Sequence, residues 1–208
     1  MKLRDLFTRR ERGRDLDEAL RELERSAESA SPGFSAPIWN RAGDLCMREG
    51  RVDRALTYYG KAIDDYLEGG RASAARALCQ KVIRVSPNVI RARRTLALLN
   101  LAEGREEEAR LQLREYVRAA KEAGQMELAI RQLHVMGDVA PNAALRETIA
   151  QQLDELGDFE GAKMLREAED ERDDDELPLE PTRRWFRFLV AAKMPPEELR
   201  RCATEAGR

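Results

Sequence analysis

The chain has few aromatic residues for its length: they make up 5% of its 208 residues, whereas Asp, Glu, Lys and Arg together make up 37%. A single thick hydrophobic core needs large apolar side chains, so this composition disfavours one. Thin amphipathic elements that share a shallow core, as in a solenoid, suit the composition better. The length predicts one domain, or one elongated array with an appendage.

A strong charge of one sign is also lacking. The 37 basic and 39 acidic residues give a net charge of -2, so the whole molecule has no field that would attract nucleic acid or an anionic membrane. Any electrostatic function must therefore be local. Only six of the basic residues are Lys, and this preference for Arg, together with abundant Ala, favours a bacterial source with a GC-rich genome.

Paired cysteines and long apolar segments are missing as well. Cys46, Cys79 and Cys202 lie far apart, which disfavours a disulfide framework and a zinc site and favours a reducing compartment. Residues 1–14 are charged throughout and lack the apolar stretch of a secretory signal. No window of the sequence approaches the ~20 apolar residues of a membrane span. We expect a soluble, cytoplasmic protein.

Glycines recur at a fixed period along the chain. Gly50 and Gly70 are 20 residues apart, as are Gly104 and Gly124, and the second pair follows the first by 54 residues. Other small residues and prolines keep nearly the same step: Gly104 and Gly157; Ala55, Ala109 and Ala162; Ala75 and Ala129; Pro87 and Pro141. These coincidences indicate an internal repeat of about 54 residues.

Between the glycines, apolar residues recur at helical spacing, which predicts amphipathic helices. Glycine suits the left-handed conformation at the end of a helix, and Pro87 and Pro141 suit a first helical turn. The predicted helices cover residues 15–29, 38–49, 52–68, 72–85, 88–102, 106–122, 126–139, 142–155 and 159–170.

The segment around the first helix pair resembles a tetratricopeptide repeat. It has a large and a small residue in the first helix, a glycine at the turn, and then alanine, aromatic and alanine, at Trp39, Gly43, Gly50, Ala55, Tyr59 and Ala62. Residues 89–122 and 142–170 repeat the pattern. The resemblance implies an all-α, right-handed solenoid, in which small residues let helices approach closely. Here each unit holds three helices in about 54 residues, whereas the family's usual unit has about 34.

We expect four segments along the chain. Residues 1–35 form a charged arm and a capping helix that packs through Leu16, Leu20 and Leu23, because every array needs terminal caps. Residues 36–170 form the repeat array. Residues 171–181 form an acidic linker, and residues 182–208 form a C-terminal helical segment.

Catalytic or metal-binding residues do not converge in the sequence. The only histidine, His134, lies on a predicted helix with no Asp, Ser or Cys at a known catalytic spacing, so a structural role is favoured. The glycines recur at repeat junctions instead of forming a phosphate-binding loop. The acidic run at 173–175 lacks the alternating ligands of a calcium loop and suits a solvated linker. We expect a protein that is not an enzyme, with no cofactor and no bound metal.

One local electrostatic feature stands out, a basic stripe on two predicted helices at Arg91, Arg94, Arg110, Arg114, Arg118 and Lys121. An acidic segment of a partner would fit against this stripe. The alternative is intrahelical pairing, which is common and weak on exposed helices, with Glu106, Glu115 and Glu122. The resemblance implies that the family's concave peptide-binding face would be lined here by Asn40, Asp44, Arg91 and Arg94.

These features favour a non-catalytic adaptor that binds another protein or peptide on an extended helical surface. The rival interpretation is a helical-repeat protein that binds nucleic acid through the basic stripe. A protein that reads one base per repeat shows the same polar pair in each unit, and this sequence has no such recurrence. The near-neutral charge also disfavours the rival.

Bulky apolar residues gather after the acidic linker, at Trp185, Phe186, Phe188, Leu189 and Val190. Side chains of this kind are seldom left in water without a role. A helix from about 182 to 193 would end before Pro195, and a second short helix would follow from 197 to 205. Two interpretations stay open: this hairpin caps the end of the solenoid, or it docks a partner.

Overall fold

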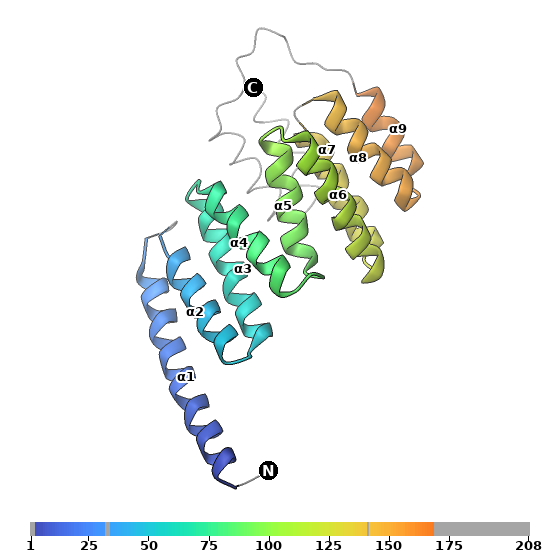
Figure 1. Ribbon diagram of the computed structural model, residues 1–208. Coiled ribbons are helices and arrows are strands. Elements are labelled where there is room, and N and C mark those ends of the chain that lie inside the picture. The colour runs from blue at the N-terminus through green and yellow to red at the C-terminus, as the bar shows by residue number, and fades with distance from the viewer. Residues whose placement is uncertain (1–2, 32–33, 141, 169–208) are drawn as a thin grey trace. The chain divides into compact units, whose positions relative to one another are not determined.

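The computed structural model describes residues 3–31, 34–140 and 142–168, without the side chains of residues 3–14 and of Val139. These residues form nine α-helices and no strand (Figure 1). The helices are α1 (Leu3–Ser29), α2 (Ala36–Arg48), α3 (Val52–Glu68), α4 (Ala72–Val85), α5 (Ile90–Ala102), α6 (Glu106–Glu122), α7 (Met126–Val139), α8 (Ala143–Leu156) and α9 (Phe159–Glu167). The prediction of an all-α fold is confirmed.

The helix bounds agree with the sequence pattern for α3, α4, α6 and α7 and differ elsewhere. The largest correction concerns α1, which begins at Leu3 instead of residue 15, so the predicted charged arm is helical. Arg, Glu and Leu are good helix formers, and the single Gly13 costs only about 1 kcal/mol, too little to end the helix. At the other end, α9 stops at Glu167 instead of residue 170.

The repeating glycines occupy helix ends, as predicted. Gly50, Gly70, Gly104 and Gly124 have φ between +66° and +68°, a left-handed conformation in which a Cβ atom would be strained. The expectation for the prolines was wrong at Pro87, which lies in the turn before α5 rather than in its first turn. There its backbone carbonyl accepts a hydrogen bond from a side chain. Pro141 lies outside the described residues.

Two compact units divide the chain, Met1–Leu78 and Cys79–Arg208, with their boundary inside α4. In the first unit, α1 packs against α2 and α2 packs against α3. Leu16 and Leu20 of α1 are buried, and Leu23 is half-buried. The hydroxyl of Tyr58 in α3 donates a 2.6 Å hydrogen bond to Glu24 of α1, so the first and third helices are also linked.

The core of the first unit combines small residues with a few large rings. Trp39 of α2 and Tyr58 of α3 stack with their ring centroids 5.9 Å apart, and the ammonium of Lys61 lies 4.2 Å from the Trp39 ring centroid. Gly43 of α2 faces the ring of the fully buried Tyr59, and a Cβ atom at position 43 would overlap that ring. The absence of a side chain at Gly43 therefore sets how closely α2 and α3 approach.

In the second unit, α5 packs against α6, α6 packs against α7 and α8, and α8 packs against α9. Gly137 of α7 faces Leu165 of α9 in the way that Gly43 faces Tyr59, because a Cβ atom there would overlap the leucine methyl groups. The 54-residue unit of three helices stays a prediction, since the third helix of its first copy, α4, crosses the boundary between the two compact units.

We expect Gly43→Ala to lower the free energy of unfolding by about 1–3 kcal/mol, the usual cost of overpacking a core. Helix propensity alone predicts the opposite sign, because alanine is better than glycine inside a helix by about 1 kcal/mol. Urea unfolding followed by circular dichroism measures the difference. A variant as stable as the parent chain would show that Tyr59 has room to move.

Candidate functional site

The basic stripe lies on two helices of the second unit, α5 and α6. The sequence of α6 places acidic residues in its first turn and Lys121 in its last, which is favourable for the helix dipole. Its apolar residues Ala109, Leu113, Tyr116 and Ala120 recur at helical spacing and are buried. The basic residues of α6 are therefore directed to the outer side of a helix whose inner side is firmly packed.

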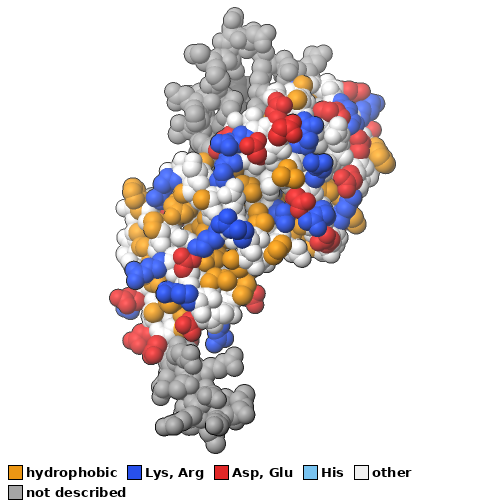
Figure 2. All heavy atoms as spheres, viewed as in Figure 1, with side chains coloured by type: hydrophobic (Ala, Val, Ile, Leu, Met, Phe, Trp, Pro, Cys, Tyr) orange, Lys and Arg blue, Asp and Glu red, His pale blue; other side chains and the backbone are white. Residues whose placement is uncertain are grey.

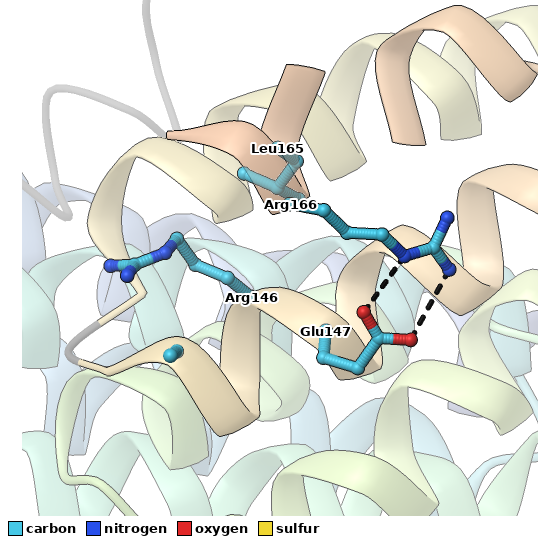
Figure 3. Close-up of a pocket in the computed structure, with 5 residues that line it drawn as sticks. Arg146, Glu147, Leu165 and Arg166 are labelled. Carbon is cyan, nitrogen blue, oxygen red and sulfur yellow. Dashed lines mark hydrogen bonds and ion pairs between the residues drawn. The ribbon is translucent and has the colours of Figure 1, made fainter. Parts of the chain in front are cut away.

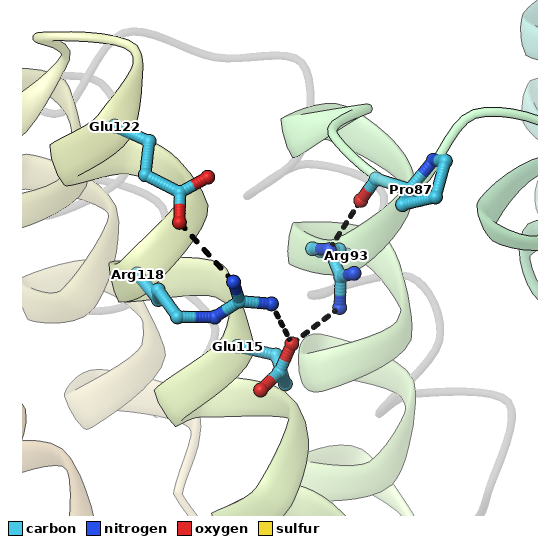
Figure 4. A network of polar contacts seen from close by, with 5 residues as sticks. All are labelled: Pro87, Arg93, Glu115, Arg118 and Glu122. Atoms are coloured by element: carbon cyan, nitrogen blue, oxygen red, sulfur yellow. Dashed lines mark hydrogen bonds and ion pairs between the residues drawn. The ribbon is translucent and has the colours of Figure 1, made fainter.

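Arg118 is held in a network that extends to α5 (Figure 4). Its guanidinium donates to Glu115 at 2.6 Å and to Glu122 at 3.1 Å. Glu115 also accepts from the buried Arg93 at 3.1 Å, and Arg93 donates through Nε to the carbonyl of Pro87 at 2.7 Å. The hydrogen bond from Arg118 lowers the pKa of the Glu115 carboxyl below its usual value of 4.5. The alternative of intrahelical pairing is thus confirmed for Arg118.

Other cations of the stripe have acidic neighbours too. Lys121 pairs with Glu155 of α8 at 2.7 Å, and Arg110 lies 3.9 Å from Glu107 on its own helix. Glu106, which was expected to pair within α6, instead accepts a 3.0 Å hydrogen bond from Asn142 at the start of α8. On the face that Figure 2 shows, Lys and Arg side chains lie among Asp and Glu side chains over the second unit.

Arg114 differs from the other basic residues of α6. It is exposed, and it forms no ion pair with another described residue. Leu111, one helical turn before it, is 49% exposed. On α5, Arg91 is exposed and Arg94 is half-buried, and both make interactions of their own. We call the surface formed by Leu111, Arg114 and Arg118 the outer face of α6.

The residues that the resemblance assigned to a shared concave face fall in different units. Asn40 and Asp44 lie on α2 in the first unit, whereas Arg91 and Arg94 lie on α5 in the second. Asp44 is half-buried and accepts a 2.6 Å hydrogen bond from the hydroxyl of Tyr59. Burial, and then this hydrogen bond, raise the pKa of Tyr59 above its usual range. Asp44 therefore has a structural partner inside its own hairpin.

His134 has an acidic partner that the sequence pattern did not reveal. Its Nε2 lies 2.7 Å from Oδ2 of Asp158, and Oδ1 of Asp158 accepts from the backbone N–H of Gly161 at 3.0 Å, capping α9. No local spacing in the sequence indicated this pair, because the two residues are 24 positions apart and meet only when α7 and the start of α9 come together. No third His, Cys, Asp or Glu joins them as a metal ligand within the described residues.

A cavity between α8 and α9 was also missed (Figure 3). It has a volume of about 300 Å³ and is lined by Ala143, Arg146, Glu147, Leu165 and Arg166. Arg166 donates to both oxygens of Glu147, at 2.8 and 3.2 Å, and to Asp154 at 2.7 Å. Sequence spacing gives no signal for a site that forms where two helices meet. The predicted partner residues Trp185, Phe186 and Phe188, and the acidic run 173–175, lie outside the described residues.

Comparison with known proteins bears on the first unit. Residues 36–64, which include α2 and most of α3, match the family model described as tetratricopeptide repeat. No curated protein and no solved structure matches the chain. The chain thus carries a tetratricopeptide repeat, and its all-helical fold is consistent with a solenoid of such repeats. In general these repeats build scaffolds for protein–protein interaction. Among the helices that the structure describes, none is long and apolar enough to cross a membrane.

The network around Glu115 predicts a pH dependence. A carboxyl whose pKa is lowered by folding stabilises the folded state above its unfolded pKa, and that contribution is lost as the pH falls through the folded pKa. We expect Glu115→Gln to be less stable than the parent chain at pH 7, and the difference to shrink below pH 4.5. Chemical unfolding at several pH values measures it.

The same substitution at Glu107, whose side chain is 85% exposed, controls for the loss of a surface charge on the same helix. A stability difference for Glu115→Gln that stays constant from pH 7 to pH 3 would show that the Arg93–Glu115–Arg118 network contributes nothing through the Glu115 charge.

Proposed function

We propose that the chain is a non-catalytic adaptor that holds an acidic segment of another protein against the outer face of α6. The repeat at residues 36–64 supports a protein-binding role in general. The observation that carries the specific proposal concerns Arg114 of α6. Its side chain is exposed and forms no ion pair with another described residue. A partner carboxylate that pairs with Arg114 has no ion pair among the described residues to displace, although the charge of Glu115 lies near enough to interact with Arg114.

The surroundings of Arg114 suit an amphipathic partner segment. Leu111 offers exposed apolar surface one turn before it, and Arg118 follows one turn later with two carboxylates already bound. Arg118 and Lys121 would therefore contribute less than Arg114, because binding a partner there requires exchange of an existing ion pair. An exposed charge of this kind contributes mainly to the association rate and to specificity.

The remaining parts of the proposal rest on the sequence. We assign residues 36–170 to the repeat array and residues 171–181 to a linker, and we place the protein in a bacterial cytoplasm. The thiol of Cys46, which is buried and free, is compatible with a reducing compartment. Asn40, Asp44, Arg91 and Arg94 remain candidates for contacts with the same or a second partner segment.

We expect Arg114→Glu to reduce capture of the partner by the immobilised full chain several-fold at low salt, because like charges then oppose each other across the interface. The fold should be unaffected, since an exposed substitution usually changes stability by no more than about 0.5 kcal/mol. Quantitative mass spectrometry of the retained proteins measures the change.

The matched control is Arg131→Glu, which reverses an exposed charge on α7 of the same unit and should leave capture unchanged. Equal losses for both variants would indicate a general charge effect and contradict the proposal. Retention of the chain on single-stranded RNA at physiological salt, abolished by Arg114→Glu, would favour the nucleic-acid interpretation instead.

A further inference from the structure

The cavity between α8 and α9 lies beside the point where the chain leaves the last described helix. Ala143, Arg146 and Glu147 belong to the first two turns of α8, and Leu165 and Arg166 belong to the last turn of α9. Ala143 and Leu165 are the apolar residues of its lining, and Figure 3 shows the side chain of Arg166 extending toward Glu147. The volume of about 300 Å³ lies at the lower end of the range for binding pockets.

The bonding of Arg166 decides what kind of group suits this cavity. Its N–H groups point to Glu147 and Asp154, and these two carboxylates already balance its charge. A further anion would therefore have to displace one of them. The flat faces of the guanidinium are not used by these in-plane bonds, and such faces stack well on aromatic rings. An aromatic side chain between apolar walls and a fixed guanidinium is the occupant that this chemistry favours.

The chain itself supplies such a group. Residues 168–184, which are 17 in number, separate the end of α9 from Trp185. Fully extended they would reach roughly 55 Å at about 3.3 Å per residue, far more than the distance across a pair of helices. A tether of this length keeps its attached group at an effective concentration in the millimolar range, so even weak docking is favoured over docking of a separate molecule.

We propose that the aromatic segment Trp185–Phe188 of the same chain docks into the cavity formed by Ala143, Arg146, Glu147, Leu165 and Arg166. Trp185 is the residue best suited to stack on Arg166, because indole is the strongest aromatic partner for a cation. This docking is independent of the partner bound on α6.

Tryptophan fluorescence tests the docking in the full chain. The protein has two tryptophans, and Trp39 is buried in the first unit, so subtracting the spectrum of Trp185→Phe isolates the emission of Trp185. We expect that emission to be shifted to short wavelength and to resist quenching by acrylamide. In Ala143→Arg, which places a bulky cation in the cavity, quenching of Trp185 should rise several-fold.

Ala144→Arg is the matched control, because Ala144 is exposed on the same turn and does not line the cavity. In this variant, quenching of Trp185 by acrylamide should equal that in the parent chain. Circular dichroism checks that each variant is folded, and Ala143→Met replaces Ala143→Arg if the latter is not. Trp185 emission that is fully quenched in the parent chain would overturn the proposal, as would shielding that Ala143→Arg leaves intact. Shielding that depends on protein concentration would show that a second copy is the occupant and would overturn it too.

Discussion

Glycines inside two of the helices allow a neighbouring side chain to come very close to the helix backbone. Gly43 lies against the ring of the fully buried Tyr59, so the lack of a side chain there sets how closely α2 and α3 approach, and Gly137 of α7 lies against the methyl groups of Leu165 in a similar way. Close approach lets alanines and a few rings make a sufficient core. This explains how a chain with 37% charged and 5% aromatic residues folds into packed hairpins, with its charges on the outer sides of the helices.

Many of the charged side chains on the outer sides of the helices form ion pairs with one another. Arg118 donates hydrogen bonds to Glu115 and Glu122, Lys121 to Glu155, and Arg166 to Glu147 and Asp154. A surface arranged in this way attracts little on its own, because each exposed pair is already partly compensated. Both proposals rest on groups that these pairs leave available: Arg114, which is exposed and has no ion pair among the described residues, and the flat face of the Arg166 guanidinium.

Features that depend on local sequence could be predicted, and features that depend on distant residues could not. The glycines predicted the ends of α3 and α6, because a left-handed residue at a helix end is a local requirement. The start of α1 was misplaced, since nothing local distinguishes a charged arm from a charged helix. The stripe on α6 follows from spacing. The partner of Lys121 lies on another helix, 34 residues away, and the partner of His134 is the residue before α9, 24 residues away. The cavity exists only after α8 and α9 pack.

The claim that a partner binds on the outer face of α6 is tested most directly by photo-cross-linking. Leu111 is 49% exposed beside Arg114, and Phe159 is 69% exposed on α9, so a photoreactive phenylalanine derivative can replace either residue without entering the core. We expect a protein with an acidic segment to be cross-linked from position 111 and not from position 159. Cross-linking from position 159 alone, or from neither position while capture persists, would contradict it.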